Sequence, residues 1–172
     1  MMEVNLQVES LAQDTHDAVA KLLGREPRGL RAVPVLNNVG QPSVIRVGSL
    51  VDGKPFPTLF WLVDAELCYR IDTAEATGLI QRLQQQVDAD PELLCAMAAD
   101  HKAHIALRNR YIDEQEKSEL QALGFYEVLQ NRGIGGIADF TRIRCLHTWY
   151  GAHLVEANTI GRLLDAYWAS GE

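Results

Sequence analysis

The amino-acid sequence predicts an α+β domain, in which a small antiparallel sheet of about three strands packs against helices. Segments with strand-like alternation and β-branched side chains are confined to the N-terminal third of the chain. After residue 64, apolar side chains recur at helical spacing through a predominantly helical C-terminal two-thirds, without the strand–helix–strand alternation of a parallel sheet. With 172 residues, 47% of them hydrophobic and 23% charged, the chain has the size and composition of a single domain, residues 1–172.

The N-terminal third is expected to contain one helix followed by the strands. Apolar residues at mostly helical spacing, followed by Gly24 as a typical helix end, predict a helix over residues 8–23. A strand is expected to begin near Arg31, because Pro27 and Gly29 interrupt helical structure there. Turn residues then separate it from two further strands, predicted at residues 43–51 and 58–63. The second of these, TLFWLV, is apolar throughout and is therefore expected at the centre of the sheet.

The rest of the chain is predicted to be helical. Residues 65–87 follow a helical apolar pattern, and Gly78 in their middle predicts either two helices or one bent helix. Asp90 followed by Pro91 is a typical helix start and predicts a helix that ends near Tyr111. Three more helices are expected at residues 113–129, 143–155 and 159–168, with a glycine-rich turn between the first two of them.

Charge and cysteine content limit the classes of partner. The formal net charge of −7 argues against an electrostatic grip on nucleic acid or on an anionic membrane. Cys68, Cys95 and Cys145 form an odd set without CxxC spacing, which favours reduced thiols over a disulfide framework or a zinc ribbon. The first residues lack the pattern of a signal peptide, and the longest apolar run is too short to cross a bilayer. We therefore expect a cytoplasmic protein whose partner is a small molecule or another cytoplasmic protein.

The segment RCLHTWYGAH near the C-terminus holds the densest group of reactive side chains. On an unbroken helix Cys145 and His147 would point about 200° apart, so they can act together only if Cys145 precedes the first turn. In that case the helix dipole and Arg144 would favour a Cys145 thiolate, which acts as nucleophile or metal ligand with His147 as its base or co-ligand. Arg144 and Arg28 are the predicted anion-binding residues. The alternative, a small structural thiol packed by Trp149, stays open.

His101 and His104 form a second candidate group, within the helix that Asp90 is expected to cap. They lie on a stripe with core-like spacing, formed by Leu94, Met97, His101, His104, Ile105 and Arg108. Two imidazoles three residues apart can share a divalent metal such as zinc, and His147 or His153 is a candidate to complete that site. Core histidines whose nitrogens are satisfied by hydrogen bonds are the alternative interpretation.

Four motifs occur in order over most of the chain: LGREPRG, PFPTLFWL, GIGGI and RCLH. Together they resemble the bacterial domain-of-unknown-function family 501, a resemblance that brings no activity, substrate or cofactor with it. It implies that Arg144, Cys145 and His147 are a signature, since the last motif is often KCLH in the family. Many relatives also carry a cysteine soon after the TLxWL strand, where this sequence has Val63-Asp64-Ala65, with Cys68 farther along.

Two functional hypotheses follow from these observations. The first is a domain that binds a small ligand, an anion or a metal ion between the sheet and the last helices, with phosphate-ester and thiol chemistry both open as catalytic activities. The second is a non-enzymatic adaptor, which the genomic neighbourhood of some relatives links to cell division or polyphosphate metabolism. Its interface would be anchored by large aromatic side chains, namely Phe125, Trp149, Tyr150 and Trp168.

Overall fold

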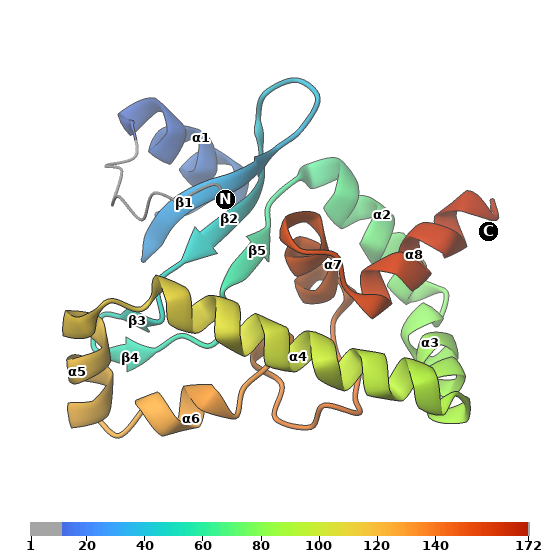
Figure 1. Ribbon diagram of the computed structural model, residues 1–172. Helices are drawn as coiled ribbons and strands as arrows, with labels where there is room; N and C mark the ends of the chain where they lie inside the picture. The colour runs from blue at the N-terminus through green and yellow to red at the C-terminus, as the bar shows by residue number, and fades with distance from the viewer. Residues whose placement is uncertain (1–11, 172) are drawn as a thin grey trace, which may run out of the picture.

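The computed structural model describes residues 12–171 and confirms the predicted α+β fold (Figure 1). Three strands form an antiparallel sheet: β1 (Leu30–Leu36), β2 (Pro42–Val47) and β5 (Phe60–Leu62). Two short strands, β3 (Leu50–Val51) and β4 (Lys54–Pro55), pair separately as a ribbon. The described part of the chain contains eight α-helices: α1 (Gln13–Leu23), α2 (Ala65–Ala76), α3 (Leu79–Ala89), α4 (Pro91–Tyr111), α5 (Glu114–Ala122), α6 (Tyr126–Gln130), α7 (Leu146–Val155) and α8 (Thr159–Ala169).

The central strand of the sheet is β2, with β1 and β5 on its two sides. The prediction that residues 58–63 form the central strand is therefore wrong. Directly after β5, the Asp64 carboxylate accepts hydrogen bonds from the backbone N–H groups of Glu66 and Leu67, and this cap starts α2 instead of a turn into another strand. The strand is apolar because α7 packs against it, so closely that a Cβ on Gly151 would lie 3.2 Å from the backbone nitrogen of Leu62.

The strand predicted over residues 43–51 is also divided. The β2 ladder ends at Val47, and the chain then enters the β3–β4 ribbon, whose turn holds Asp52 at φ 51° and Gly53 at φ 71°. The side chain of Arg31 from β1 lies against Gly48, where a Cβ would meet its Nε at 2.9 Å. The alternation of apolar residues across 43–51 did not reveal this change of partner.

Helices cover both faces of the sheet (Figure 1). The larger hydrophobic cluster lies between the sheet and the C-terminal helices, with Val44 and Phe60 from the sheet packed among residues such as Met97, Leu146 and Trp149. A smaller cluster on the opposite face joins Val19 of α1 to β2 and β5. Alternate residues of β2 therefore enter different clusters, as the period-two geometry of a strand requires.

Glycines set two of the helix boundaries. Gly78, at φ 84°, separates α2 from α3, so the two-helix alternative for residues 65–87 is confirmed. The single helix predicted over residues 113–129 is wrong, because Gly124 adopts φ 75° and divides it into α5 and α6. The α4 boundaries are confirmed, with Asp90 accepting hydrogen bonds from Glu92 and Leu93. Part of the predicted first helix, residues 8–11, lies outside the described residues.

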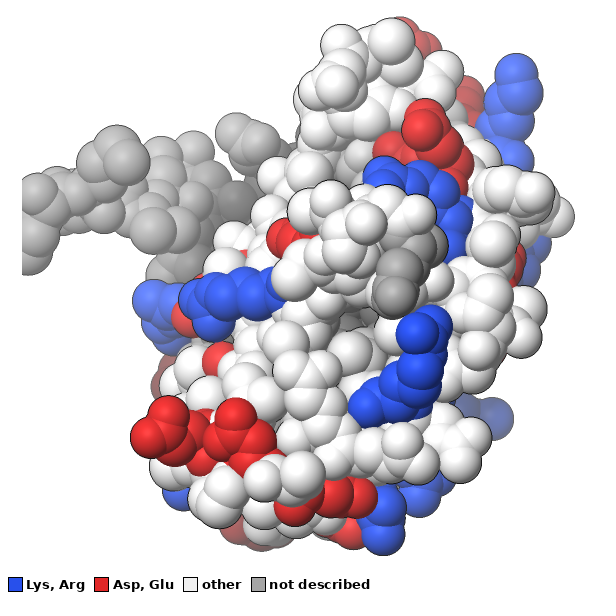
Figure 2. Space-filling model, turned by 90° about the vertical axis from the view of Figure 1, so that its right-hand side faces the viewer, with Lys and Arg blue, Asp and Glu red and all other residues white. Residues whose placement is uncertain are grey.

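Within residues 12–171, no helix combines the length and the apolar character that a membrane span requires. Figure 2 shows basic and acidic side chains interspersed among uncharged ones on the side of the molecule that includes α8. That side of the molecule therefore carries charges of both signs.

Candidate functional site

Cys145 and His147 converge at the start of α7. The predicted helix over 143–155 begins at Leu146 instead, and Cys145 is its N-cap residue, with the extended backbone angles φ −146° and ψ 117°. Sγ of Cys145 therefore lies 3.7 Å from Nδ1 of His147, although the same two residues on a continuous helix would point apart. The condition under which the sequence allowed them to act together is met.

The segment before α7 stays extended because Gln84 of α3 holds it on both sides. The Gln84 side-chain amide donates to the carbonyl oxygen of Thr141 at 2.8 Å and accepts from the backbone N–H of Ile143 at 2.8 Å. These two bonds occupy backbone groups that a helix would use internally. The late start of α7 is therefore set by tertiary contacts.

Two carboxylates from α2 complete the group. The Glu75 Oε1 atom lies 3.5 Å from Nδ1 of His147 and accepts the backbone N–H of Leu146 at 2.9 Å. Oδ1 of Asp72 lies 3.0 Å from the other ring nitrogen, Nε2. Each imidazole nitrogen thus faces a carboxylate, and Nδ1 also faces the thiol.

Three potential metal ligands lie within 4.8 Å of one another in this group: a carboxylate oxygen of Glu75, Sγ of Cys145 and a ring nitrogen of His147. All three residues are partly buried, and the side chains of Glu75 and His147 each keep 26% exposure. Within residues 12–171, no other group of three or more His, Cys, Asp or Glu side chains has its potential metal-binding atoms this close together. Sequence reasoning found Cys145 and His147 but missed Glu75 and Asp72.

Cys68 lies near the group without belonging to it. It precedes Asp72 by one helical turn on α2, and its thiol contacts the carbonyl oxygen of Leu62 at 3.7 Å. Burial raises the pKa of the Cys68 thiol, and the negative charges of Asp72 and Asp64 act in the same direction. Cys68 is therefore a neutral thiol at neutral pH, beside a site that contains a second thiol.

The two predicted anion-binding arginines lie apart from each other. Arg28 is exposed and forms a long ion pair with Asp52, at 3.6 Å, beside a cavity that neither Cys145 nor His147 lines. Arg144 is exposed and directly precedes Cys145 in the sequence. Two hydrogen bonds from Thr141 lower the pKa of Asp139, and the positive charges of Arg142 and Arg144 lower it further. Of the two arginines, only Arg144 is a sequence neighbour of Cys145.

His101 and His104 are buried in the core on α4. Nδ1 of His101 accepts the backbone N–H of Ile134 at 3.0 Å, while its ring stacks on Phe140 and meets Trp149 edge-on. Burial lowers the pKa of His101 to about 4 and that of His104 to about 3. Both rings are therefore neutral at neutral pH, and neither belongs to the group of three ligands; a metal bound to them stays a prediction.

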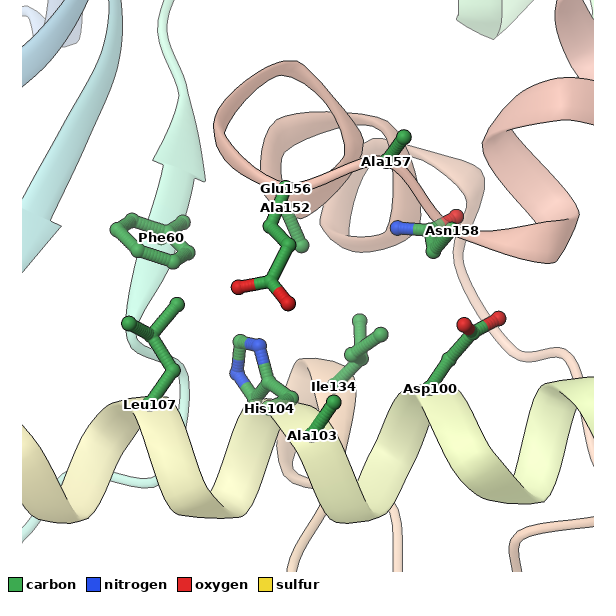
Figure 3. Close-up of a pocket in the computed structure, with 10 residues that line it drawn as sticks. All are labelled: Phe60, Asp100, Ala103, His104, Leu107, Ile134, Ala152, Glu156, Ala157 and Asn158. Atoms are coloured by element: carbon green, nitrogen blue, oxygen red, sulfur yellow. The ribbon is translucent and has the colours of Figure 1, made fainter. Parts of the chain in front are cut away.

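His104 faces a small cavity, which Figure 3 shows between α4 and the turn after α7. The Glu156 carboxylate extends toward its imidazole, and Phe60 and Leu107 close one side. Nε2 of His104 is buried without a hydrogen-bond partner. The cavity measures about 30 Å³, enough for ordered water but far below the roughly 300–1,000 Å³ of pockets that bind organic ligands.

Two of the four aromatic anchors proposed for an adaptor are core residues. Trp149 is fully buried, and Tyr150 is 7% exposed, with its hydroxyl donating to Asp165 at 2.8 Å. Trp168 is half-buried, since Arg70 covers its ring at 4.1 Å, and Phe125 is also half-buried. The set does not form the exposed apolar patch that the adaptor hypothesis requires.

Arg108 is a buried residue whose role the sequence did not reveal. Its guanidinium donates to the carbonyl oxygen of Leu129 in the last turn of α6, to those of Arg132 and Gly133 after this helix, and to that of Pro57 before β5. Desolvation lowers its pKa to about 10, so it remains charged at neutral pH. Arg108 therefore holds the loop between α6 and α7 in place. In the sequence, a charged residue within an apolar helical stripe was the signal that indicated a buried polar role.

No curated protein and no solved structure matches the chain. A family described as "Protein of unknown function (DUF501)" matches residues 33–166, which include β2, β5 and all helices of the candidate site. Three of the four motifs that suggested this family, PFPTLFWL, GIGGI and RCLH, lie within the matched residues, whereas LGREPRG precedes them. Because the match covers most of the chain, the chain belongs to the DUF501 family.

Proposed function

We propose that the protein binds one divalent metal ion, zinc in the first instance, through Sγ of Cys145, Nδ1 of His147 and a carboxylate oxygen of Glu75. The observation that carries the proposal is the spacing of these atoms, 3.7 Å from Sγ to Nδ1 and 3.5 Å from Nδ1 to Oε1. In a tetrahedral site with ordinary zinc–ligand bond lengths, sulfur and nitrogen lie about 3.6 Å apart and nitrogen and oxygen about 3.3 Å apart. Shifts of a few tenths of an ångström would therefore suffice.

The types of ligand favour zinc over the hard cations. A thiolate and an imidazole suit Zn²⁺, whereas Mg²⁺ and Ca²⁺ prefer sites made of oxygen ligands. Once deprotonated, Cys145 and Glu75 would supply two negative charges, which balance the charge of the ion. The ligand set differs from the predicted pair of core histidines, since it takes a carboxylate from α2 instead.

Two further contacts support the roles of the ligands. With the proton on Nε2, His147 would donate a hydrogen bond to Asp72, which leaves the lone pair of Nδ1 free for a metal, as in many zinc sites where a carboxylate orients the histidine. The backbone N–H of Leu146 donates to Glu75 and holds that carboxylate at the start of α7. Both partners are set by the packing of α2 against α7.

Three protein ligands leave one position for water or an anion, the arrangement typical of catalytic zinc sites. The 26% exposure of Glu75 and His147 gives that position access to solvent. Arg144 is the residue next to Cys145 that would attract an anionic ligand. A bound zinc ion would supply Lewis-acid polarisation there.

A second candidate function is nucleophilic catalysis by Cys145 without a metal. The contacts run from Sγ of Cys145 to Nδ1 of His147 at 3.7 Å and from Nε2 to Asp72 at 3.0 Å, the order of nucleophile, base and orienting carboxylate. The two candidates differ in Glu75, which is a ligand in the first and only a helix cap in the second. Glu75→Gln would abolish zinc binding in the first case and leave alkylation of Cys145 by iodoacetamide intact in the second.

Native mass spectrometry with elemental analysis tests the proposal on full-length protein purified without a metal-affinity column and then incubated with zinc. We expect one tightly held zinc ion per chain in the wild type. Cys145→Ser, His147→Gln and Glu75→Gln should each lose it, because each removes a ligand atom. The measurement should be repeated with a competing chelator to obtain dissociation constants.

Matched substitutions elsewhere control for general effects on the protein. Cys95→Ser removes an exposed cysteine on α4, His16→Gln a histidine on α1 and Glu92→Gln a carboxylate on α4. These variants should bind zinc as the wild type does. Equal zinc affinity in the site variants and their controls, or no zinc retained by the wild type, would contradict the proposal.

A further inference from the structure

A second cavity lies on the opposite face of the sheet from the candidate metal centre. It is bounded by the end of α1, the sheet and the β3–β4 ribbon, and measures about 230 Å³. Its floor is apolar and consists of side chains from β2, β3 and β5 and from the approach to β5: Ile45, Val47, Val51, Phe56 and Trp61. The rings of Phe56 and Trp61 stack there with centroids 5.7 Å apart.

The rim of this cavity is basic. Arg25, Arg28 and Lys54 line it together with one carboxylate, that of Asp52. Asp52 pairs with Arg28 at 3.6 Å, and both side chains are largely exposed, so that pair is weak. Arg25 and Lys54 form no ion pair with any residue in the described range 12–171. Three positive charges against one negative charge thus surround an apolar floor, in a protein whose net charge is −7.

We propose that this cavity binds a small organic anion, whose apolar body lies on Phe56 and Trp61 and whose charged group lies among Arg25, Arg28 and Lys54. The charge of the rim selects an anion, and the floor selects an apolar body, since burial of apolar surface is the main source of affinity in such pockets. The volume lies below the range of about 300–1,000 Å³ typical of pockets for drug-sized ligands, so the ligand is small. The anion-binding role predicted for Arg28 is thereby assigned to a site separate from Cys145.

The test uses the full-length protein and the fluorescent probe 8-anilinonaphthalene-1-sulfonate, which combines aromatic rings with one negative charge. We expect saturable binding of the probe and its displacement by octanoate or by phenyl phosphate. Octanoate as the better competitor would identify an aliphatic ligand, and phenyl phosphate an aromatic one. Both results support an apolar anion; displacement by neither would overturn the proposal.

Variants separate the cavity from non-specific binding. The double substitution Arg25→Ala with Lys54→Ala should weaken probe binding about tenfold, because it removes two charges from the rim. The control, Lys102→Ala with Arg110→Ala, makes the same change in net charge at exposed positions on α4 and should bind as the wild type does. Equal affinities in the two double variants would overturn the proposal.

A third variant fills the cavity without a change in charge. Val51→Trp places a large side chain in the space above the floor and should abolish displaceable probe binding. Circular dichroism establishes that the variant is folded. A folded Val51→Trp variant that binds the probe like the wild type would likewise exclude this cavity as the site.

Discussion

Asp72→Asn is expected to weaken zinc binding about tenfold and to leave the fold intact. Asp72 is not a proposed ligand, but its Oδ1 lies 3.0 Å from Nε2 of His147. A hydrogen bond from an Nε2–H to this oxygen would keep the proton on Nε2 and make Nδ1 the metal-binding nitrogen. Loss of such a partner lowers metal affinity about 10–100-fold. Because the Asp72 side chain is 68% exposed, water screens its charge and the low end of this range applies. A tenfold loss corresponds to about 1.4 kcal/mol.

Competition with a fluorescent zinc chelator at neutral pH measures this difference. The control is Asp165→Asn, because Asp165 forms a similar contact with a histidine outside the site, 2.9 Å from Nε2 of His153. The control should retain the wild-type dissociation constant. Equal dissociation constants for the wild type and Asp72→Asn, or equal losses in the two variants, would refute the assignment of Nδ1 as the ligand atom.

Three further predictions concern the core beside the site. Burial lowers the pKa of His101 to about 4 and of His104 to about 3, below their unfolded value, so the unfolded state binds more protons between those values. The free energy of unfolding should therefore fall below pH 6.5, by on the order of 2 kcal/mol per histidine at pH 5, and equal urea midpoints at pH 7 and pH 5 would contradict this. Gly133→Ala should destabilise the protein by about 3 kcal/mol, since its Cβ would collide with the His101 ring; a wild-type melting temperature would count against the observed packing. Arg108→Met should cost at least about 3 kcal/mol, because it removes hydrogen bonds from buried carbonyls, whereas Arg110→Met, at an exposed position on α4, should change the urea midpoint little.

Local signals in the sequence were sufficient for most helix boundaries. Asp90 and Pro91 define the start of α4 through a side-chain cap and a fixed φ, both of which are properties of the residues themselves. Gly124 carried a similar signal and marks the break that the prediction for residues 113–129 overlooked. The strand order, in contrast, could not be predicted from such local signals. The apolar character of β5 results from burial by α7 and not from pairing with strands on both edges.

The candidate site could be predicted only in part for the same reason. The RCLH motif indicated Cys145 and His147 as site residues. Their spacing showed that the two side chains can meet only if Cys145 precedes the first turn of the helix. That condition depends on Gln84, whose contacts hold the preceding segment extended. Glu75 and Asp72 come from a helix some 70 residues earlier, a distance over which spacing carries no information about contact. Cys68, Asp72 and Glu75 recur at helical spacing and therefore share one side of α2. This spacing indicated a polar face, but it did not indicate that α7 packs against that face.

X-ray absorption at the zinc edge tests the central claim most directly, on full-length protein loaded with one equivalent of zinc. The account predicts one sulfur neighbour at about 2.3 Å and nitrogen or oxygen neighbours at about 2.0–2.1 Å, including the outer-shell pattern of one imidazole. Cys145→Ser should remove the sulfur contribution, whereas Cys95→Ser should leave the spectrum unchanged. A coordination shell without sulfur in the wild type, or a sulfur neighbour that persists in Cys145→Ser, would contradict a metal centre at the start of α7.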